Sequence, residues 1–257
     1  AEALASGNVA VGEGAFTSTS YNGPFYYLYG SLKSQYLVSA AELTAAGLAA
    51  GNITALSFDI ASSTGTTFND FTLSLGSTTV TALSATFETG LTSVFYTAGL
   101  TPTTGIFTIT FDTPFSWDGS SNLVVETCWS NNNSGSSTNS AHVKRDNTSY
   151  TATSYYRVDN QPASVVCPTT TRTGSYSSRP QMFFMGVTSC SSPRSAVVAT
   201  VATPPALTIT PDQSVCNNSV AMMEVTSTLA DYDTYVWTPE ANLFTDMACT
   251  VPYVAGA

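Results

Sequence analysis

Asn122-Leu-Val-Val-Glu-Thr-Cys-Trp129 is the stretch of sequence that decides the fold. Its centre is a continuous apolar run, which is typical of a β-strand buried on both faces. Gly105-Ile-Phe-Thr-Ile-Thr-Phe-Asp112, which precedes it, alternates apolar and polar residues and therefore indicates a strand with one buried face. Because a doubly buried strand needs a packed layer on each side, the sequence predicts sheets that pack against each other.

More strand patterns lie outward from this stretch, and turn residues separate them. Ile53–Ile60 and Phe71–Leu75 alternate in the same way. Ser154–Val158 and Gln181–Gly186 are further candidate strands. The turns are marked by Gly65, Gly76, Thr101-Pro102, Asp118-Gly119 and Ser134-Gly135. Short strands at this spacing predict an all-β fold, and specifically a jelly-roll-like β-sandwich.

One short helix is expected among the strands. Ser39-Ala-Ala-Glu42 is a capping box, in which the Ser39 hydroxyl accepts the N–H of Glu42 and the Glu42 carboxylate reaches back to Ser39. Gly47 supplies a C-terminal stop, since glycine adopts the left-handed backbone that ends many helices.

A change of module is expected near the adjacent prolines of Ala202-Thr-Pro-Pro-Ala206. We assign 1–190 to the jelly-roll-like module, 191–206 to a linker strand, and 207–257 to the start of an immunoglobulin-like or PKD-like module. Cys216, a central Trp237 and Cys249 favour the immunoglobulin-like pattern. Because a sandwich of this type needs roughly 100 residues, we expect this second module to be incomplete.

The composition indicates an extracellular protein. Only 9% of the 257 residues are charged, and the net charge is −10 with 7 basic against 17 acidic residues. That balance argues against nucleic acid and against anionic membrane surfaces as partners, since both require a basic face. No apolar run approaches the roughly 18 residues of a membrane span.

The five cysteines support the same location, because disulfides persist outside the cell. We expect the pairs Cys128–Cys167 and Cys216–Cys249, which leaves Cys190 without a partner in this chain. The alternative is that all five are reduced core residues. No Cys-x-x-Cys pair occurs and no cysteine lies near the single histidine, so the sequence does not predict a zinc or redox site.

We expect no catalytic residues and no enzyme activity. His142 is the only histidine that a Ser–His–Asp triad could use, and the chain has no Gly-x-Ser-x-Gly elbow. The best enzymatic alternative is a secreted glycoside hydrolase, which needs only two suitably separated carboxylates. The candidate carboxylates are Glu88, Asp112, Asp118 and Glu126.

A cofactor is not required by any pattern, but the loops offer candidate ligands for calcium. Ca²⁺ takes six to eight oxygen ligands, and jelly rolls often hold one ion with loop carboxylates. The candidate ligands are Asp70, Asp112, Asp118 and Asp159. The alternative interpretation is that these are solvated turn carboxylates.

Aromatic residues are the candidate ligand contacts, since amphipathic rings suit a sugar-binding or protein-binding face. The residues chosen are Tyr26, Tyr27, Trp117 and Trp129. The alternative is sheet packing, in which aromatic residues are also favoured. Trp237 is expected in the core of the second module.

Several segments are similar to modules that recur in giant secreted surface proteins of Bacteroidota. They are Gln35–Gly47, Phe87–Phe95, Phe111–Glu126, Tyr155–Asp159 and Arg179–Phe184. Ser191–Val201 resembles the closing strand of the immunoglobulin-like repeats in those proteins. Val215-Cys216 and Tyr235–Pro239 look like the opening and the central Trp strand of a PKD-like repeat.

This resemblance implies export by type IX secretion and a role in adhesion, surface filaments or gliding, and it brings no catalytic set. We therefore expect a non-catalytic extracellular module that acts in adhesion or builds a surface filament. Its partners would be other modules of the same chain, neighbouring subunits, or a polysaccharide or cell surface. The alternative is a carbohydrate-binding module of a secreted multidomain enzyme.

Overall fold

A computed structural model describes residues 4–17, 21, 23–136, 138–189, 203–214, 216 and 219–255. The chain divides into two units, Ala1–Pro193 and Arg194–Ala257, and each is described by itself. The division falls inside the expected linker 191–206. Cys190 and residues 191–202 of that linker lie outside the described residues.

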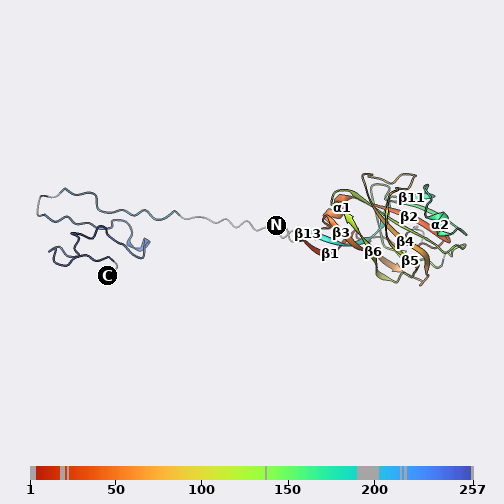
Figure 1. The fold of residues 1–257 in the computed structure, drawn as a ribbon, viewed down its shortest axis with the longest axis horizontal. Helices are drawn as coiled ribbons and strands as arrows, with labels where there is room; N and C mark the ends of the chain where they lie inside the picture. The colour runs from red at the N-terminus through yellow and green to blue at the C-terminus, as the bar shows by residue number, and fades with distance from the viewer. Residues whose placement is uncertain are drawn as a thin grey trace. The chain divides into compact units, whose positions relative to one another are not determined.

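The first unit is a sandwich of antiparallel sheets, which confirms the all-β prediction (Figure 1). One sheet has six strands in the order β11 (Gly174–Tyr176), β10 (Thr153–Val158), β2 (Ser31–Val38), β7 (Asn122–Ser130), β4 (Phe68–Thr78) and β5 (Thr92–Leu100). The other has five: β1 (Leu4–Val11), β13 (Met182–Ser189), β3 (Gly51–Ser62) and β6 (Gly105–Trp117) in order, with β8 (His142–Val143) paired to β3. A two-stranded ribbon joins β9 (Arg145–Asn147) to β12 (Ser178–Pro180). Most paired strands are not consecutive in the sequence, as a jelly-roll-like connection requires.

Strand β7 lies in the middle of the six-stranded sheet and is buried on both faces, as its continuous apolar run predicts. It pairs with β2 on one side and with β4 on the other. Leu123 and Val125 belong to the main core between the sheets. Val124, whose side chain points the opposite way, packs with Leu37 and Leu83 in a second cluster on the outer face.

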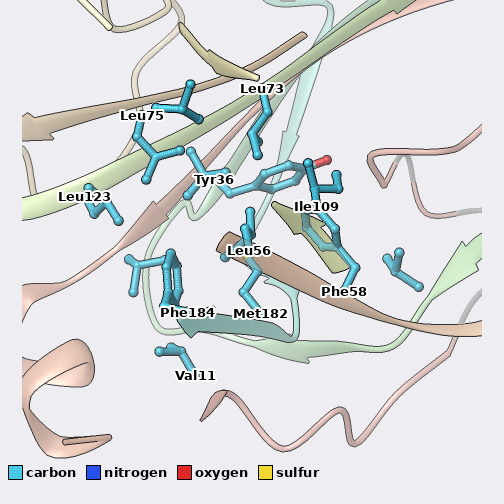
Figure 2. Packing of buried hydrophobic residues seen from close by; sticks show 14 of the residues in the cluster. Val11, Tyr36, Leu56, Phe58, Leu73, Leu75, Ile109, Leu123, Met182 and Phe184 are labelled. Carbon is cyan, nitrogen blue, oxygen red and sulfur yellow. The ribbon is translucent and has the colours of Figure 1, made fainter. Parts of the chain in front are cut away.

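The main core lies between the two sheets. Figure 2 shows Tyr36, Leu73 and Leu75 of the six-stranded sheet facing Phe58 and Phe184 of the five-stranded sheet. All five side chains are fully buried. Burial of one such apolar side chain contributes about 1.5–3 kcal/mol, so this layer is the main source of stability.

Three buried hydroxyl groups lie together inside the core and have only weak contacts, which they make with one another. They belong to Ser34, Tyr36 and Thr127. Burial raises the pKa of Tyr36 well above its ordinary value, because the phenolate would be desolvated, while contacts with the Ser34 and Thr127 hydroxyls act against this rise. The buried hydroxyl of Tyr21 differs, since it lies 2.9 Å from the hydroxyl of Thr153.

We expect Tyr36→Phe to change the free energy of unfolding by less than about 1 kcal/mol, because the buried hydroxyl has only weak contacts with Ser34 and Thr127. Tyr21→Phe is expected to lower the free energy of unfolding by about 1 kcal/mol, because a satisfied hydrogen bond is lost. Urea denaturation of the two variants measures both effects. A loss of more than about 1 kcal/mol for Tyr36→Phe would contradict the expectation.

Helix α1 (Ala40–Ala45) begins and ends where the sequence predicts. The Ser39 hydroxyl accepts the N–H of Glu42, and the Ser39 N–H donates to the Glu42 carboxylate at 3.0 Å. Gly47 has a φ of +97°, a conformation that a residue with a Cβ rarely adopts. Its N–H donates to the carbonyl of Thr44 at 2.9 Å and so caps the end of the helix.

An ion pair fastens α1 to the β9–β12 ribbon. Arg179, which is only 3% exposed, donates to Glu42 at 2.6 Å, and the Tyr150 hydroxyl donates to the same carboxylate at 2.9 Å. Burial acts to raise the pKa of Glu42, but the hydrogen bonds from Arg179 and Ser39 outweigh it and lower the pKa to about 2.

The Glu42–Arg179 ion pair makes the free energy of unfolding depend on pH in the acid range. The folded-state pKa of Glu42 lies below its ordinary value of 4.5, so its contribution is present above that pH and is lost as the pH falls toward about 2. We expect the difference in free energy of unfolding between the natural chain and Glu42→Gln to shrink across this window. Urea denaturation at a series of pH values tests this, with the exposed Glu13→Gln as the control. A difference that stays constant from pH 4.5 to 2 would overturn the assignment.

A second short helix, α2 (Ala163–Val166), corrects the expectation of a single helix. Its N-cap is Pro162, whose side chain makes no capping hydrogen bond, so the sequence carries no cap signal there. Val166 is fully buried, and Cys167 ends the helix. The helix places this cysteine against the outer face of β7. In Figure 1, α1 and α2 lie at opposite ends of the first unit.

The second unit corrects two expectations. Its described residues include no buried side chain, and their only β contacts are isolated bridges at Ile209 and Phe244. Trp237 is half-buried instead of lying in a core.

Cys216 and Cys249 are both free thiols, so the predicted second disulfide is wrong for this structure. A disulfide needs two held backbones, and no packed layer among these residues holds them. The immunoglobulin-like arrangement stays a prediction.

Candidate functional site

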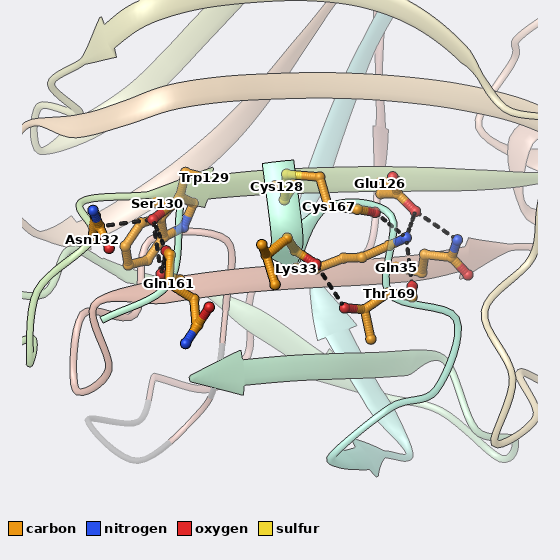
Figure 3. Close-up of a disulfide and its surroundings, with 12 residues drawn as sticks. Lys33, Gln35, Glu126, Cys128, Trp129, Ser130, Asn132, Gln161, Cys167 and Thr169 are labelled. Atoms are coloured by element: carbon orange, nitrogen blue, oxygen red, sulfur yellow. Dashed lines mark hydrogen bonds and ion pairs between the residues drawn. A yellow bond between two sulfur atoms is a disulfide. The ribbon is translucent and has the colours of Figure 1, made fainter. Parts of the chain in front are cut away.

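The outer face of the six-stranded sheet carries a buried polar layer, formed by Lys33 and Gln35 on β2 and Glu126 on β7. Lys33 is only 6% exposed. The predicted disulfide between Cys128 and Cys167 is confirmed, with a Cα–Cα distance of 5.8 Å. Figure 3 shows it beside the layer, where it ties the end of α2 to β7. The disulfide therefore holds a cover over these charged groups.

The ammonium group of Lys33 has several partners under this cover. It lies 3.4 Å from the carboxylate of Glu126 and donates to the backbone carbonyls of Cys167 at 2.7 Å and Thr169 at 3.0 Å. It also sits 4.8 Å from the centre of the Phe87 ring. The buried positive charge is thus balanced by an anion, by dipoles and by an aromatic face.

Gln35 extends the polar layer to the loop between β4 and β5. Its side-chain amide donates to Glu126 at 2.8 Å and to the backbone carbonyl of Glu88 at 2.7 Å, and it accepts the Glu88 N–H at 2.8 Å. Burial raises the pKa of Glu126, while Lys33 and Gln35 act against this rise. The groups of this layer satisfy one another, so its chemical role is to fasten the covering loops.

The ion pair predicts a pattern of coupled stability changes. Lys33→Met is expected to cost about 3–5 kcal/mol, because it leaves the buried Glu126 carboxylate without its cation. The double change Lys33→Met with Glu126→Leu is expected to cost less than Lys33→Met alone. Urea denaturation under oxidising conditions gives the coupling energy. Costs that simply add would show that the two side chains do not depend on each other.

A ladder of stacked aromatic and guanidinium groups lies at the β10–β11 end of the same sheet. In order, its members are Tyr29, Arg157, Tyr155, Tyr176, Tyr21, Arg145 and Phe16. The Arg157 guanidinium lies 4.5 Å from the ring centre of Tyr29 and 5.5 Å from that of Tyr155. Tyr155 and Tyr176 stack at 5.3 Å with an angle of 22° between their planes.

The remaining contacts of the ladder continue from Tyr176. Its ring centre is 5.1 Å from that of Tyr21, and the Arg145 guanidinium is 5.3 Å from Tyr21 and 5.9 Å from Phe16. Phe16 and Arg145 also exchange two backbone hydrogen bonds of 3.0 and 2.9 Å. The ladder therefore holds Phe16, Tyr21 and Tyr29 against the sheet edge and restricts the motion of its own rings.

One end of the ladder reaches the surface and forms the candidate functional site, which we call the tyrosine–arginine cluster. It comprises Tyr26, Tyr29, Tyr155, Arg157 and Tyr176. Tyr155 is buried, and the other four are half-buried. Burial raises the pKa of Tyr26, with the positive charge of Arg157 opposing the rise. Aromatic faces, phenol groups and a guanidinium, held on β10, on β11 and just before β2, are the elements of a binding surface.

The aromatic residues selected from the sequence divide between core and surface. Trp117, Trp129 and Tyr27 are buried, so assigning them to ligand contact was wrong. The Trp129 ring packs 4.7 Å from Phe68, and its indole N–H donates to the carbonyl of Pro24 at 2.8 Å. The indole N–H of Trp117 donates to a backbone carbonyl in the same way. Only Tyr26 of the four belongs to the candidate site.

The four predicted calcium ligands have separate structural roles. Asp70 accepts the hydroxyl of Tyr96, and Asp112 accepts the Tyr96 N–H, both at 3.1 Å. Asp118 closes its own turn by accepting two backbone N–H groups, and Asp159 accepts the N–H of Gly30 at 2.9 Å. Within the described ranges, no group of three or more acidic, histidine or cysteine side chains is placed to hold a metal. The structure does not gather these four carboxylates into one site.

The candidate catalytic residues are likewise dispersed. His142 lies on β8, and partial burial lowers its pKa. Gln35 bonds the carboxylate of Glu126 but only the backbone of Glu88, whose own carboxylate accepts the Thr78 hydroxyl at 3.0 Å. Asp112 lies on β6, and Asp118 lies in the turn after it.

Tyr29 and Tyr155 belong to the aromatic-rich stretches of the sequence but were not among the four predicted contacts, and no prediction pointed to Arg157 or Tyr176. A signal existed in Tyr155-Tyr156-Arg157, because residues two apart on a strand share one face. The pairing of Tyr155 with Gly174 places Tyr176 nearby, and that long-range register cannot be read from a local pattern.

Comparisons with protein-family models, with curated proteins and with solved structures find no match. Among the described residues, no helix is long and apolar enough to cross a membrane.

Proposed function

We propose that this chain is a non-catalytic extracellular module that acts in adhesion. It would belong to a large cell-surface protein that is exported by type IX secretion and also takes part in gliding. The observation that carries the proposal is the tyrosine–arginine cluster. Tyr155, Arg157 and Tyr176 are held on β10 and β11, and stacking contacts hold their rings and guanidinium in place, so they lose little entropy on binding. A pre-ordered surface of this composition suits repeated contacts with a sugar-rich or protein surface.

The disulfide-held cover supports an extracellular location, since such bonds persist in oxidising compartments. The low charge of the chain supports a role in contact with other surfaces. A hydroxyl-rich surface can associate with many partners without strong electrostatic selection. We assign no catalytic role to the polar layer, because its charged groups already bind one another and the covering loops.

A filament-building role remains the second form of this proposal, and the second unit favours it. Leu207 is 53% exposed, Ile209 is 49% exposed and Val236 is 59% exposed. These residues line a shallow groove with Tyr235 and Trp237. Exposed apolar side chains of this kind mark surfaces that contact other modules or neighbouring subunits.

The cluster also favours the alternative of a carbohydrate-binding module in a secreted multidomain enzyme. Phenol rings and a guanidinium recognise sugars as readily on such a module as on an adhesin. Soluble oligosaccharides separate the two roles. A binding module retains a short soluble ligand, whereas an adhesin depends on many weak contacts made together.

We expect beads coated with the full chain to be retained on at least one of agarose, cellulose, chitin, xylan and polygalacturonate. Tyr29→Ala is expected to reduce retention about tenfold, because it removes the ring that stacks on Arg157. The matched control is Tyr96→Ala, which removes a tyrosine that is 56% exposed on β5.

Equal retention of the natural chain and Tyr29→Ala would reject the cluster as the contact surface. Regular filaments of the natural chain in electron micrographs, unchanged by Tyr29→Ala, would replace adhesion by the filament role.

A further inference from the structure

The edge strands of the two large sheets differ in how they are protected from pairing with another chain. An edge strand carries a row of unpaired backbone groups, and proteins block such rows with short strands, bulges, charges or prolines. Strand β11 has only three residues. Strand β6 carries Asp112 and Pro114, and its register with β3 shifts once. The register of β5 with β4 also shifts, and the N–H of Tyr96 on β5 donates to the Asp112 carboxylate at 3.1 Å. Each of these three edges is therefore blocked.

Strand β1 is the fourth edge, and it has none of these features. Its eight residues, Leu4–Val11, include no charged residue and no proline. They pair with β13 in one unbroken antiparallel register. Within the described part of the chain, β1 has no other strand partner. The backbone groups on its other side therefore form a template for one further strand.

The side chains of β1 specify what kind of strand can continue the sheet. Val9 and Val11 are buried in the core, whereas Ser6, Asn8 and Ala10 are exposed. This alternation gives the strand a core face and a solvent face. A strand that pairs with it in register must carry the same alternation, and the β1 strand of a second copy does so by identity.

Charge also favours a second copy at this edge. The net charge of the chain is −10, so two copies repel each other over most of their surfaces. The uncharged β1 edge is a place where like-charged copies can approach closely. A partner recognised by its positive charge would need acidic groups along the strand, and β1 has none.

We propose that this edge joins two copies of the chain through an antiparallel pair of β1 strands related by a two-fold axis. In the register that centres on Asn8, residues 5–11 of each copy pair with each other, and Val9 stays on the core face of both sheets. The two Asn8 side chains then face each other and can exchange amide hydrogen bonds. Both open edges are used in this pair, so assembly through β1 stops at the dimer. The proposal concerns assembly and does not depend on the proposed contact function.

Sedimentation velocity of the full chain at increasing concentration is expected to show a monomer–dimer equilibrium. Asn8→Lys and Asn8→Glu are each expected to weaken the dimer about tenfold, because like charges then face each other across the pair. An equimolar mixture of the two variants is expected to restore the dimer, because the facing charges are then opposite. Hydrogen exchange gives a second readout, in which the amides of β1 exchange more slowly at concentrations where the dimer forms.

The matched control is Ser93→Lys, which adds the same charge at an exposed position of β5 and is expected to leave the dimer intact. Lysine lowers the net negative charge, so general repulsion alone would predict tighter association of both lysine variants. Circular dichroism confirms that each variant is folded. If both Asn8 variants unfold, hydrogen exchange of the natural chain decides the question.

A chain that stays monomeric at all concentrations overturns the proposal, as does β1 exchange that is independent of concentration. A dimer that Asn8→Lys leaves intact also overturns it, because such a dimer forms through another surface, such as the groove of the second unit. A mixture that fails to restore the dimer contradicts the two-fold pairing at Asn8. None of these outcomes changes the retention on polysaccharides that Tyr29→Ala tests.

Discussion

The structure depends on covering the outer face of a sheet whose central strand is apolar on both sides. Only the inner face of β7 meets the opposite sheet, so the outer face must be closed by loops. Loops carry backbone polar groups that lose water when they cover a sheet. Lys33 and Gln35 meet this demand by bonding to those groups, and Glu126 bonds to both side chains. The Cys128–Cys167 disulfide keeps the cover attached to β7.

The buried Lys33–Glu126 pair adds little stability, but it determines where the covering loops lie. A buried ion pair gains little over apolar residues of similar volume, because both ions are desolvated. It does fix which loop lies where, since only one placement supplies the acceptors that Lys33 needs. The same sheet carries the tyrosine–arginine cluster at its β10–β11 edge, so a rigid scaffold and an ordered contact surface follow from one arrangement. The ladder adds to this order by tying the segment between β1 and β2 to the sheet.

Local patterns predicted the capped helix, the first disulfide and the strands β3, β4, β6, β7, β10 and β13, but they did not predict β1, β2 or β5. They failed where long-range packing decides. Trp129 was assigned to ligand contact since it precedes a polar loop, yet its ring fills the core beside Phe68. Helix α2 lacks a cap signal. The cluster joins residues from three distant segments, so only Tyr26 and the spacing of Tyr155 and Arg157 were visible beforehand.

The pairing of the first and last strands has a mechanical consequence. Leu4 lies opposite Ser189, and the antiparallel β1–β13 ladder runs inward from that pair. Tension applied through these two residues loads the hydrogen bonds one after another, as in opening a zipper, instead of shearing all of them together. The sandwich would then yield at low force from this edge. The Cys128–Cys167 disulfide involves the other sheet, and it keeps the residues between the two cysteines from extending under tension. The unit would therefore unfold at low force, but only up to a limited length.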